Sequence, residues 1–165
     1  MAHDTRDTDD TSAARRPHAQ DRHDVAPVIV VGLDGSPSSW DAVCWAAGEA
    51  ARINGKVVVV YVTPLTGSAA AFGVPYDYAG VEQARQEIAE ELRREVARHA
   101  YELGVELSFV TEHGDVTHVL TDVASRMHAN LVVVGRSAKV LHHLAGSLSH
   151  RLVSRNNAPV VVVVP

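Results

Sequence analysis

The chain has 165 residues, about the size of one ordinary domain, and 46% of them are hydrophobic, which is enough to form a substantial core. Its formal net charge of −5 argues against a broad electrostatic affinity for nucleic acid or for an anionic membrane. A single cysteine, Cys44, excludes an internal disulfide. No apolar run reaches the roughly 20 residues of a membrane span and no hydrophobic signal region precedes the first motif, so we expect a soluble, cytoplasmic protein.

Residues 1–26 differ in composition from everything that follows. They are polar, mixed in charge and free of aromatic residues. Such a segment cannot bury enough apolar surface to offset the entropy lost on ordering. We therefore expect a disordered tail over 1–26 and one domain over 27–165.

From Pro27 onward, apolar runs alternate with amphipathic segments. The expected strands are Val28–Leu33, Lys56–Thr63, Val105–Glu112, Leu131–Gly135 and Pro159–Val164. The expected helices begin at Ser38 or Ser39 and end at Asn54-Gly55, then cover Val81–Leu103, Asp115–His128 and Ser147–Arg155. This alternation predicts an α/β fold with a five-stranded parallel sheet, strand order 3-2-1-4-5, and helices on both faces.

Two of the expected strands are followed by glycine and then by a serine-rich segment at which a helix is expected to begin. They are VIVVGLDGSPSS (Val28–Ser39) and LVVVGRSAKVLHHLAGSLS (Leu131–Ser149). Backbone N–H groups and the positive end of a helix dipole at such a corner suit a phosphate group. The predicted order makes the first and fourth strands neighbours, and ligands of open α/β sheets collect at that kind of junction. We therefore predict a nucleotide site there, and a lid or binding loop over Pro64–Tyr78.

These corners resemble the universal stress protein family over nearly all of Val28–Pro165. Other shared motifs are YVTP after the second strand, HGD before the third helix, GSLSHRLV and the closing APVVVV. The resemblance implies an adenine nucleotide alpha hydrolase-like (flavodoxin-like) three-layer sandwich and a role in the stress response. It also implies ATP or another adenine nucleotide as ligand, with Mg²⁺ as a possible companion ion. A homodimer through the fifth strand, involving Val160, Val162 and Val164, is implied as well, because an apolar edge strand is a pairing liability unless another chain covers it.

The ATP-binding branch of that family has a loop of the form G-x2-G-x9-G-[ST], and this chain departs from it. Gly135 fills the first position, but Ala138 stands at the second. By resemblance, Asp34 would accept hydrogen bonds from the adenine or ribose side, and Val62 would meet the base through its backbone. Gly135 would let the chain pass beneath the ribose. From this sequence itself, and not from the resemblance, we expect Arg136 to add positive charge where the loop has lost a glycine.

The phosphates would lie at the far end of the same loop. Seven residues, rather than nine, separate Ala138 from Gly146. By resemblance, Gly146, Ser147 and Leu148 would offer backbone N–H groups to the phosphates, and Ser147 would also offer its hydroxyl. Ser149 is a further candidate contact.

Plainer interpretations remain open for each feature. The turn after the first strand can be an ordinary helix cap, and Ser147 can be only an N-cap. A nucleotide-free dimeric scaffold with an unidentified protein partner is the alternative function. We expect no efficient catalysis, because no general base is evident, and no metal site formed by protein side chains alone. Cys44, Trp40 and Trp45 are expected to pack in the core.

Overall fold

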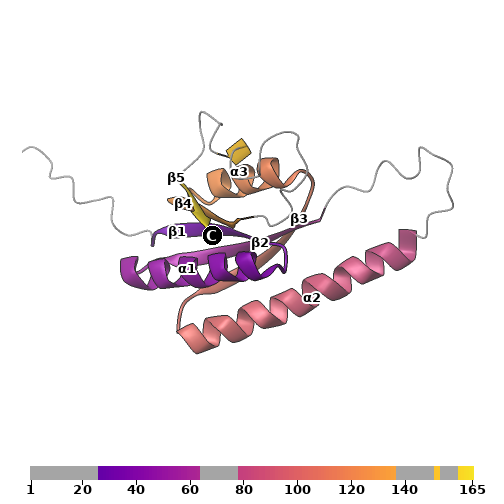
Figure 1. Ribbon diagram of the computed structural model, residues 1–165, viewed down its shortest axis with the longest axis horizontal. Coiled ribbons are helices and arrows are strands. Elements are labelled where there is room, and N and C mark those ends of the chain that lie inside the picture. Colours follow the sequence, from indigo (N-terminus) through magenta and orange to yellow (C-terminus); the bar gives the residue numbers. More distant parts are fainter. Residues whose placement is uncertain (1–25, 64–77, 137–150, 153–159) are drawn as a thin grey trace, which may run out of the picture.

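The computed structural model describes residues 26–63, 78–136, 151–152 and 160–165. The elements, in chain order, are β1 (Val28–Leu33), α1 (Pro37–Ile53), β2 (Lys56–Thr63), α2 (Tyr78–Leu103), β3 (Leu107–His113), α3 (Val116–Arg126), β4 (Leu131–Gly135) and β5 (Val160–Val164). The five strands are parallel and lie in the order β3-β2-β1-β4-β5, which confirms the predicted sheet (Figure 1).

The sheet is covered on both faces, so the predicted three layers are confirmed. One core cluster joins Ile29, Val31 and Leu33 of β1 to α1 and α2. The other core cluster joins the alternate residues of the same strands to α3 and to Leu152. Because successive side chains of a strand point to opposite faces, the unbroken apolar runs of β1 and β2 contribute residues to both clusters.

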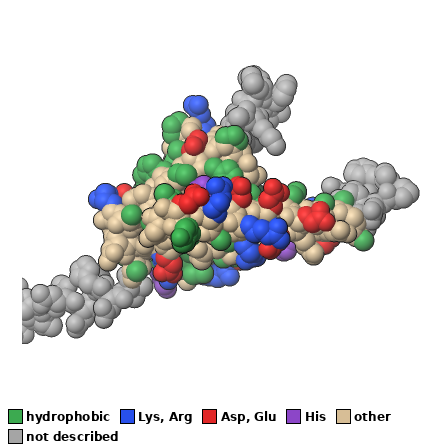
Figure 2. Space-filling model, turned by 90° about the horizontal axis from the view of Figure 1, so that it is seen from below, with side chains coloured by type: hydrophobic (Ala, Val, Ile, Leu, Met, Phe, Trp, Pro, Cys, Tyr) green, Lys and Arg blue, Asp and Glu red, His purple; other side chains and the backbone are tan. Residues whose placement is uncertain are grey.

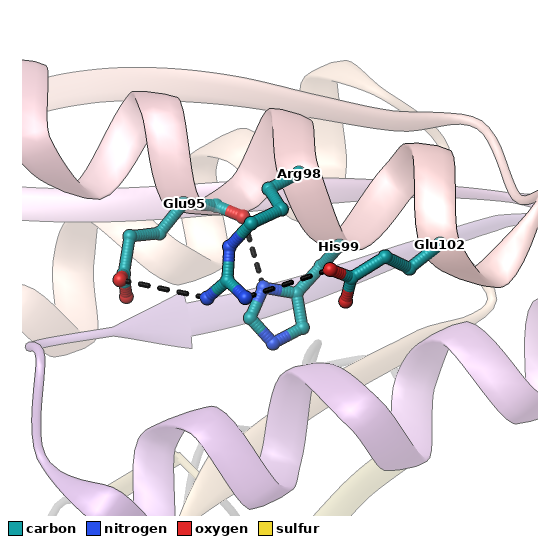
Figure 3. Close-up of polar contacts among 4 residues, drawn as sticks. All are labelled: Glu95, Arg98, His99 and Glu102. Carbon is teal, nitrogen blue, oxygen red and sulfur yellow. Dashed lines mark hydrogen bonds and ion pairs between the residues drawn. The ribbon is translucent and has the colours of Figure 1, made fainter.

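A stacked pair of rings ties α2 to α1. His99 of α2 lies with its ring centroid 5.0 Å from that of Trp40, at an interplanar angle of 16°. Nδ1 of His99 donates to the carbonyl of Glu95 at 2.9 Å, and beside it Arg98 pairs with Glu95 and Glu102 (Figure 3). The prediction that Trp40 packs is therefore confirmed.

Several boundaries differ from the sequence-based ones. The N-cap of α1 is Ser36, with Pro37 in the first turn, so the helix begins before the predicted Ser38 or Ser39. The helix expected from Val81 begins three residues earlier, at Tyr78. The third strand begins at Leu107 rather than Val105, and the fifth at Val160 rather than Pro159.

The prediction that Cys44 and Trp45 pack in the core was wrong. Cys44 is exposed, and Trp45 is 41% exposed. Both side chains occupy the solvent side of α1, whose buried positions are small residues such as Ala42, Ala46 and Ala50. An apolar residue type on a short helix does not by itself identify the buried face.

Parts of the sequence-based interpretation lie outside the described residues: the tail before Ala26, the segment 64–77, and 137–150 with Ala138, Gly146, Ser147, Leu148 and Ser149. Of the predicted last helix, Arg151 and Leu152 are described and are helical. Among the helices that the structure describes, none is long and apolar enough to cross a membrane. The domain limits and the cytoplasmic location stay predictions.

Candidate functional site

The carboxyl ends of β1, β2 and β4 bring four of the predicted site residues to one edge of the sheet. Leu33 of β1 pairs with Tyr61 of β2, so Asp34 and Val62 follow at the same level. Val31 pairs with Val133 of β4, and continuing that register places Arg136 beside Asp34. Asp34, Val62, Gly135 and Arg136 thus lie along a continuous stretch of this edge.

The described residues that come after β1 and after β4 pack on opposite faces of the sheet. After β1 the chain enters α1, whose buried residues belong to the cluster that also contains α2. After β4 it arrives at Leu152, which is 1% exposed and packs in the opposite cluster with α3. Neighbouring strands that are followed by elements on opposite faces leave a crevice beyond their carboxyl ends.

A network of hydrogen bonds fixes the corner after β1. Oδ1 of Asp34 accepts the N–H of Ser36 at 3.0 Å. Oγ of Ser39 accepts the N–H of Asp34 at 3.3 Å and donates to the carbonyl of Ser36 at 2.8 Å. Gly35 has φ +81°, a conformation that favours glycine. The corner after β1 is therefore a turn that leads into a helix cap, as the plainer interpretation expected. The side chain of Asp34 is exposed at the carboxyl edge of the sheet.

The end of β4 lies against the first turn of α1. A Cβ at Gly135 would stand 2.3 Å from the Ser38 carbonyl oxygen and 2.8 Å from the Ser39 nitrogen. Glycine is therefore required here for close approach of two backbones. The next residue, Arg136, donates its N–H to the Val164 carbonyl at 2.8 Å and leaves its side chain exposed.

Polar residues at the ends of β2 and β3 were missed by sequence reasoning. Val62 is half-buried and packs toward α3. Its neighbour Thr63 is 2% exposed; its hydroxyl donates to the Glu112 carbonyl at 3.3 Å and contacts Nδ1 of His113. The sequence does show a polar residue at the end of each of these strands. That Thr63 and His113 lie opposite each other follows only from the register of β2 and β3.

Asp115 and Arg151 form a second pair that sequence reasoning missed. Asp115, which was expected as the first residue of the third helix, is instead the N-cap of α3 and accepts the N–H of His118 at 3.0 Å. Arg151 also donates to this carboxylate at 2.8 Å. The Arg151 guanidinium first, and then the His118 N–H, hold the pKa of the Asp115 carboxyl below its usual range. The pair anchors the chain just after the predicted phosphate loop.

Solved structures share this fold. A universal stress family protein from Burkholderia pseudomallei superposes with a TM-score of 0.68 at 24% identity, covering 84% of this chain and 95% of that one. A universal stress protein in complex with cAMP gives 0.63 at 24% identity, covering 85% and 97%. These likenesses show the adenine nucleotide alpha hydrolase-like fold.

Two more distant structures also contain adenine nucleotides. A universal stress protein from Archaeoglobus fulgidus in complex with dAMP has a TM-score of 0.57 at 21% identity, covering 85% of this chain and 98% of that one. A family protein from Arabidopsis thaliana with AMP bound has a TM-score of 0.60 at 19% identity, covering 84% and 90%.

Sequence comparison identifies the family. A universal stress protein of Mycobacterium tuberculosis is 34% identical over 143 residues, which cover 82% of this chain and 47% of that relative. The chain thus spans about half the length of these mycobacterial relatives. A relative from Methanocaldococcus jannaschii is 26% identical over 139 residues, covering 82% of this chain and 80% of the relative. The model of the universal stress protein family matches residues 27–164. The chain belongs to the universal stress protein family.

Proposed function

We propose that this chain is a nucleotide-binding regulatory module that holds an adenine nucleotide at the carboxyl edge of the sheet, between β1 and β4. The observation that carries the proposal is that α1, which follows β1, and Leu152, which comes after β4, pack on opposite faces of the sheet, beside Asp34 and Gly135. Binding of cAMP, dAMP and AMP by other proteins with this fold supports an adenine nucleotide as the ligand class.

Within this proposal each residue has a distinct task. The Asp34 carboxylate accepts hydrogen bonds from the base or ribose. The backbone of Val62 borders the base. The bare Cα of Gly135, already pressed against Ser38, leaves the ribose side open. The exposed Arg136 side chain supplies positive charge to the phosphates.

The phosphate-binding task falls to the segment between Arg136 and Arg151. We propose that Gly146, Ser147 and Leu148 donate backbone N–H groups to the phosphates and that Ser149 makes a further contact. Ala138 is the position at which this loop departs from the family pattern. The ligand is ATP in this proposal, and Mg²⁺ enters with its phosphates, as this ion commonly does. No catalytic residue is assigned.

We further propose that the module acts in the stress response as a homodimer joined through β5. Val160 and Val163 of this edge strand are 65% and 40% exposed. The predicted contact residues Val162 and Val164 are instead partly buried and pack against the core beneath α1. Val160 and Val163 therefore provide the exposed side chains, and the β5 backbone provides the edge.

The test is calorimetric titration of purified, nucleotide-stripped protein with MgATP, AMP and cAMP. MgGTP is the control that shows whether the protein distinguishes adenine from another base. Asp34→Asn keeps an oxygen for the Ser36 N–H but removes the negative charge, and Asp41→Asn removes an exposed charge from the side of α1. Gly146→Val adds a side chain to the phosphate segment. We expect a Kd for MgATP of about 100 µM or below, roughly −5.5 kcal/mol.

The variants decide where the nucleotide lies. Asp34→Asn and Gly146→Val should each weaken binding about tenfold or more, equivalent to about 1.4 kcal/mol, with Asp41→Asn matching the wild type. Absence of heat at millimolar ATP contradicts the nucleotide proposal and leaves the dimeric scaffold with an unidentified protein partner as the function.

A further inference from the structure

A concave site lies at the carboxyl edge of the sheet beside β2 and β3. This α2 groove, as we call it, has a volume of about 330 Å³. Its floor is formed by Thr63 at the end of β2 and by Thr111 and His113 at the end of β3. Its volume lies in the range of small-molecule sites.

The wall of the groove is the first half of α2, which extends beyond the carboxyl ends of the strands (Figure 1). Arg85, Ala89 and Arg93 follow one another at four-residue intervals, so they share one side of the helix. The small Ala89 leaves space between the two longer side chains. The Arg93 guanidinium lies 5.0 Å from the centre of the Phe109 ring, which holds it over the sheet.

Opposite charges stand side by side along this wall. Glu82 pairs with Arg85 at 3.8 Å, and Glu90 pairs with Arg93 at 3.5 Å. Figure 2 shows acidic and basic side chains interspersed over the surface that α2 contributes. A simple anion or cation would meet both acidic and basic side chains in this groove, so attraction to one kind would be offset by repulsion from the other. A ligand that carries both charges can satisfy both kinds of side chain, and the half-exposed pair of Glu90 with Arg93 exchanges partners at little cost.

One polar group on the floor lacks a partner. The hydroxyl oxygen of Thr111 is buried and makes no hydrogen bond within the part of the chain that the structure describes. Buried hydroxyls are almost always paired, with protein, water or ligand. Thr111 also lines the groove, but its oxygen is closed to solvent, so a bound molecule can pair with it only when the Thr111 side chain turns its hydroxyl toward the groove.

We propose that the α2 groove binds a small zwitterion with a carboxylate and an ammonium group, the chemistry of a free amino acid. The carboxylate pairs with Arg93, the ammonium group pairs with Glu90, and a polar side chain reaches the Thr111 hydroxyl. None of the residues assigned to the nucleotide lines the groove, so this site is separate from the proposed function.

The test uses L-glutamine and two analogues that each lack one charge. N-acetyl-L-glutamine has no ammonium group, and L-glutaminamide has no carboxylate. Titrations are followed by amide NMR shifts on the full chain, without nucleotide. We expect L-glutamine to saturate shifts at Thr63, Thr111 and His113 with a Kd of about 1 mM, and each analogue to bind about tenfold more weakly.

Two variants test the contacts. Arg93→Gln should weaken L-glutamine binding about tenfold, whereas Arg98→Gln, at a similarly exposed arginine further along α2 that does not line the groove, should leave it unchanged. Thr111→Val should weaken binding several-fold and also raise the thermal midpoint of the free protein, because it removes an unpaired buried hydroxyl. Thermal midpoints of all variants show whether each remains folded.

The proposal is overturned if L-glutamine causes no shifts at 10 mM or so, a range far above the expected Kd. It is equally overturned if an analogue binds as well as L-glutamine, or if Arg98→Gln weakens binding as much as Arg93→Gln. A parallel MgATP titration of the same samples reports on the nucleotide site, so failure at one site is distinguishable from failure at the other.

Discussion

Gly135 and Gly48 differ in whether the structure around them has room for a side chain. A Cβ at Gly135 would meet the Ser38 carbonyl at 2.3 Å, closer than any real Cβ contact, and both partners are backbone. A Cβ at Gly48, on the exposed side of α1, would meet nothing within 4 Å. The first glycine lets β4 approach α1, while the second only lowers the helix propensity of α1.

Alanine at these two positions should therefore have opposite effects. Gly135→Ala pushes the end of β4 from the first turn of α1 and should lower the free energy of unfolding by about 1–3 kcal/mol. Gly48→Ala should raise it by about 0.5–1 kcal/mol, because alanine favours a helix interior. Urea unfolding measures both. Equal stability of Gly135→Ala and the wild type would contradict the close approach of the two backbones.

The pair between Asp115 and Arg151 predicts a dependence on pH. The folded-state pKa of Asp115 is depressed, so its contribution to stability is complete above the ordinary aspartate pKa and is lost as pH falls through the lower folded-state pKa. Arg151→Gln should raise the Asp115 pKa toward its ordinary value. Both side chains are about half-exposed, so we expect a stability loss of only about 0.2–1 kcal/mol at neutral pH, vanishing in acid.

Carboxyl-carbon NMR titration of Asp115 measures the pKa shift, and urea unfolding at several pH values measures the loss of stability. Arg126→Gln is the matched control, because Arg126 pairs with Glu112 and Asp122 instead. An unchanged Asp115 pKa in Arg151→Gln would show that the capping bond to His118 alone depresses it.

At the level of elements, the central strands were predictable and the helix starts were not. The bounds of β1, β2 and β4 match the sequence-based ones because each is an unbroken apolar run between polar residues or glycine. The start of α1 was misplaced because three serines compete for the cap; in the structure Ser36 is the cap, with an extended backbone and a hydroxyl that accepts the Ser39 N–H. The early start of α2 has no apolar signal, since its first turns extend past the sheet.

The same limit applies to the site. The positions of Asp34 and Gly135 at neighbouring strand ends followed from the predicted strand order. The contacts of Thr63 with His113, 50 residues apart, and of Asp115 with Arg151, 36 apart, depend on register and helix packing, which local patterns do not encode. Ile88 shows a further limit of local patterns: it continues the apolar stripe of Leu92 and Val96 on α2, yet it is 47% exposed.

For the whole molecule, the two edges of the sheet differ in how well they discourage pairing. The β3 edge carries Ser108, Glu112 and His113, and polar or charged residues blunt an edge strand. The β5 edge consists of five valines with no polar residue among them. This asymmetry favours association through β5, and two-fold symmetry would bring one β5 against its copy.

Lysine at the exposed β5 positions should therefore separate the protomers without unfolding them. The double variant Val160→Lys/Val163→Lys places like charges where two copies would meet, and both positions are exposed enough to accept lysine in the folded monomer. Ile88→Lys is the control, because it also replaces an exposed apolar residue but lies on α2. We expect sedimentation velocity at micromolar concentration to give a dimer for the wild type and for Ile88→Lys, and a monomer for the β5 variant. A dimer that survives both β5 lysines would mean that the copies meet through another surface, since two-fold pairing of β5 with its copy would bring these like charges close together.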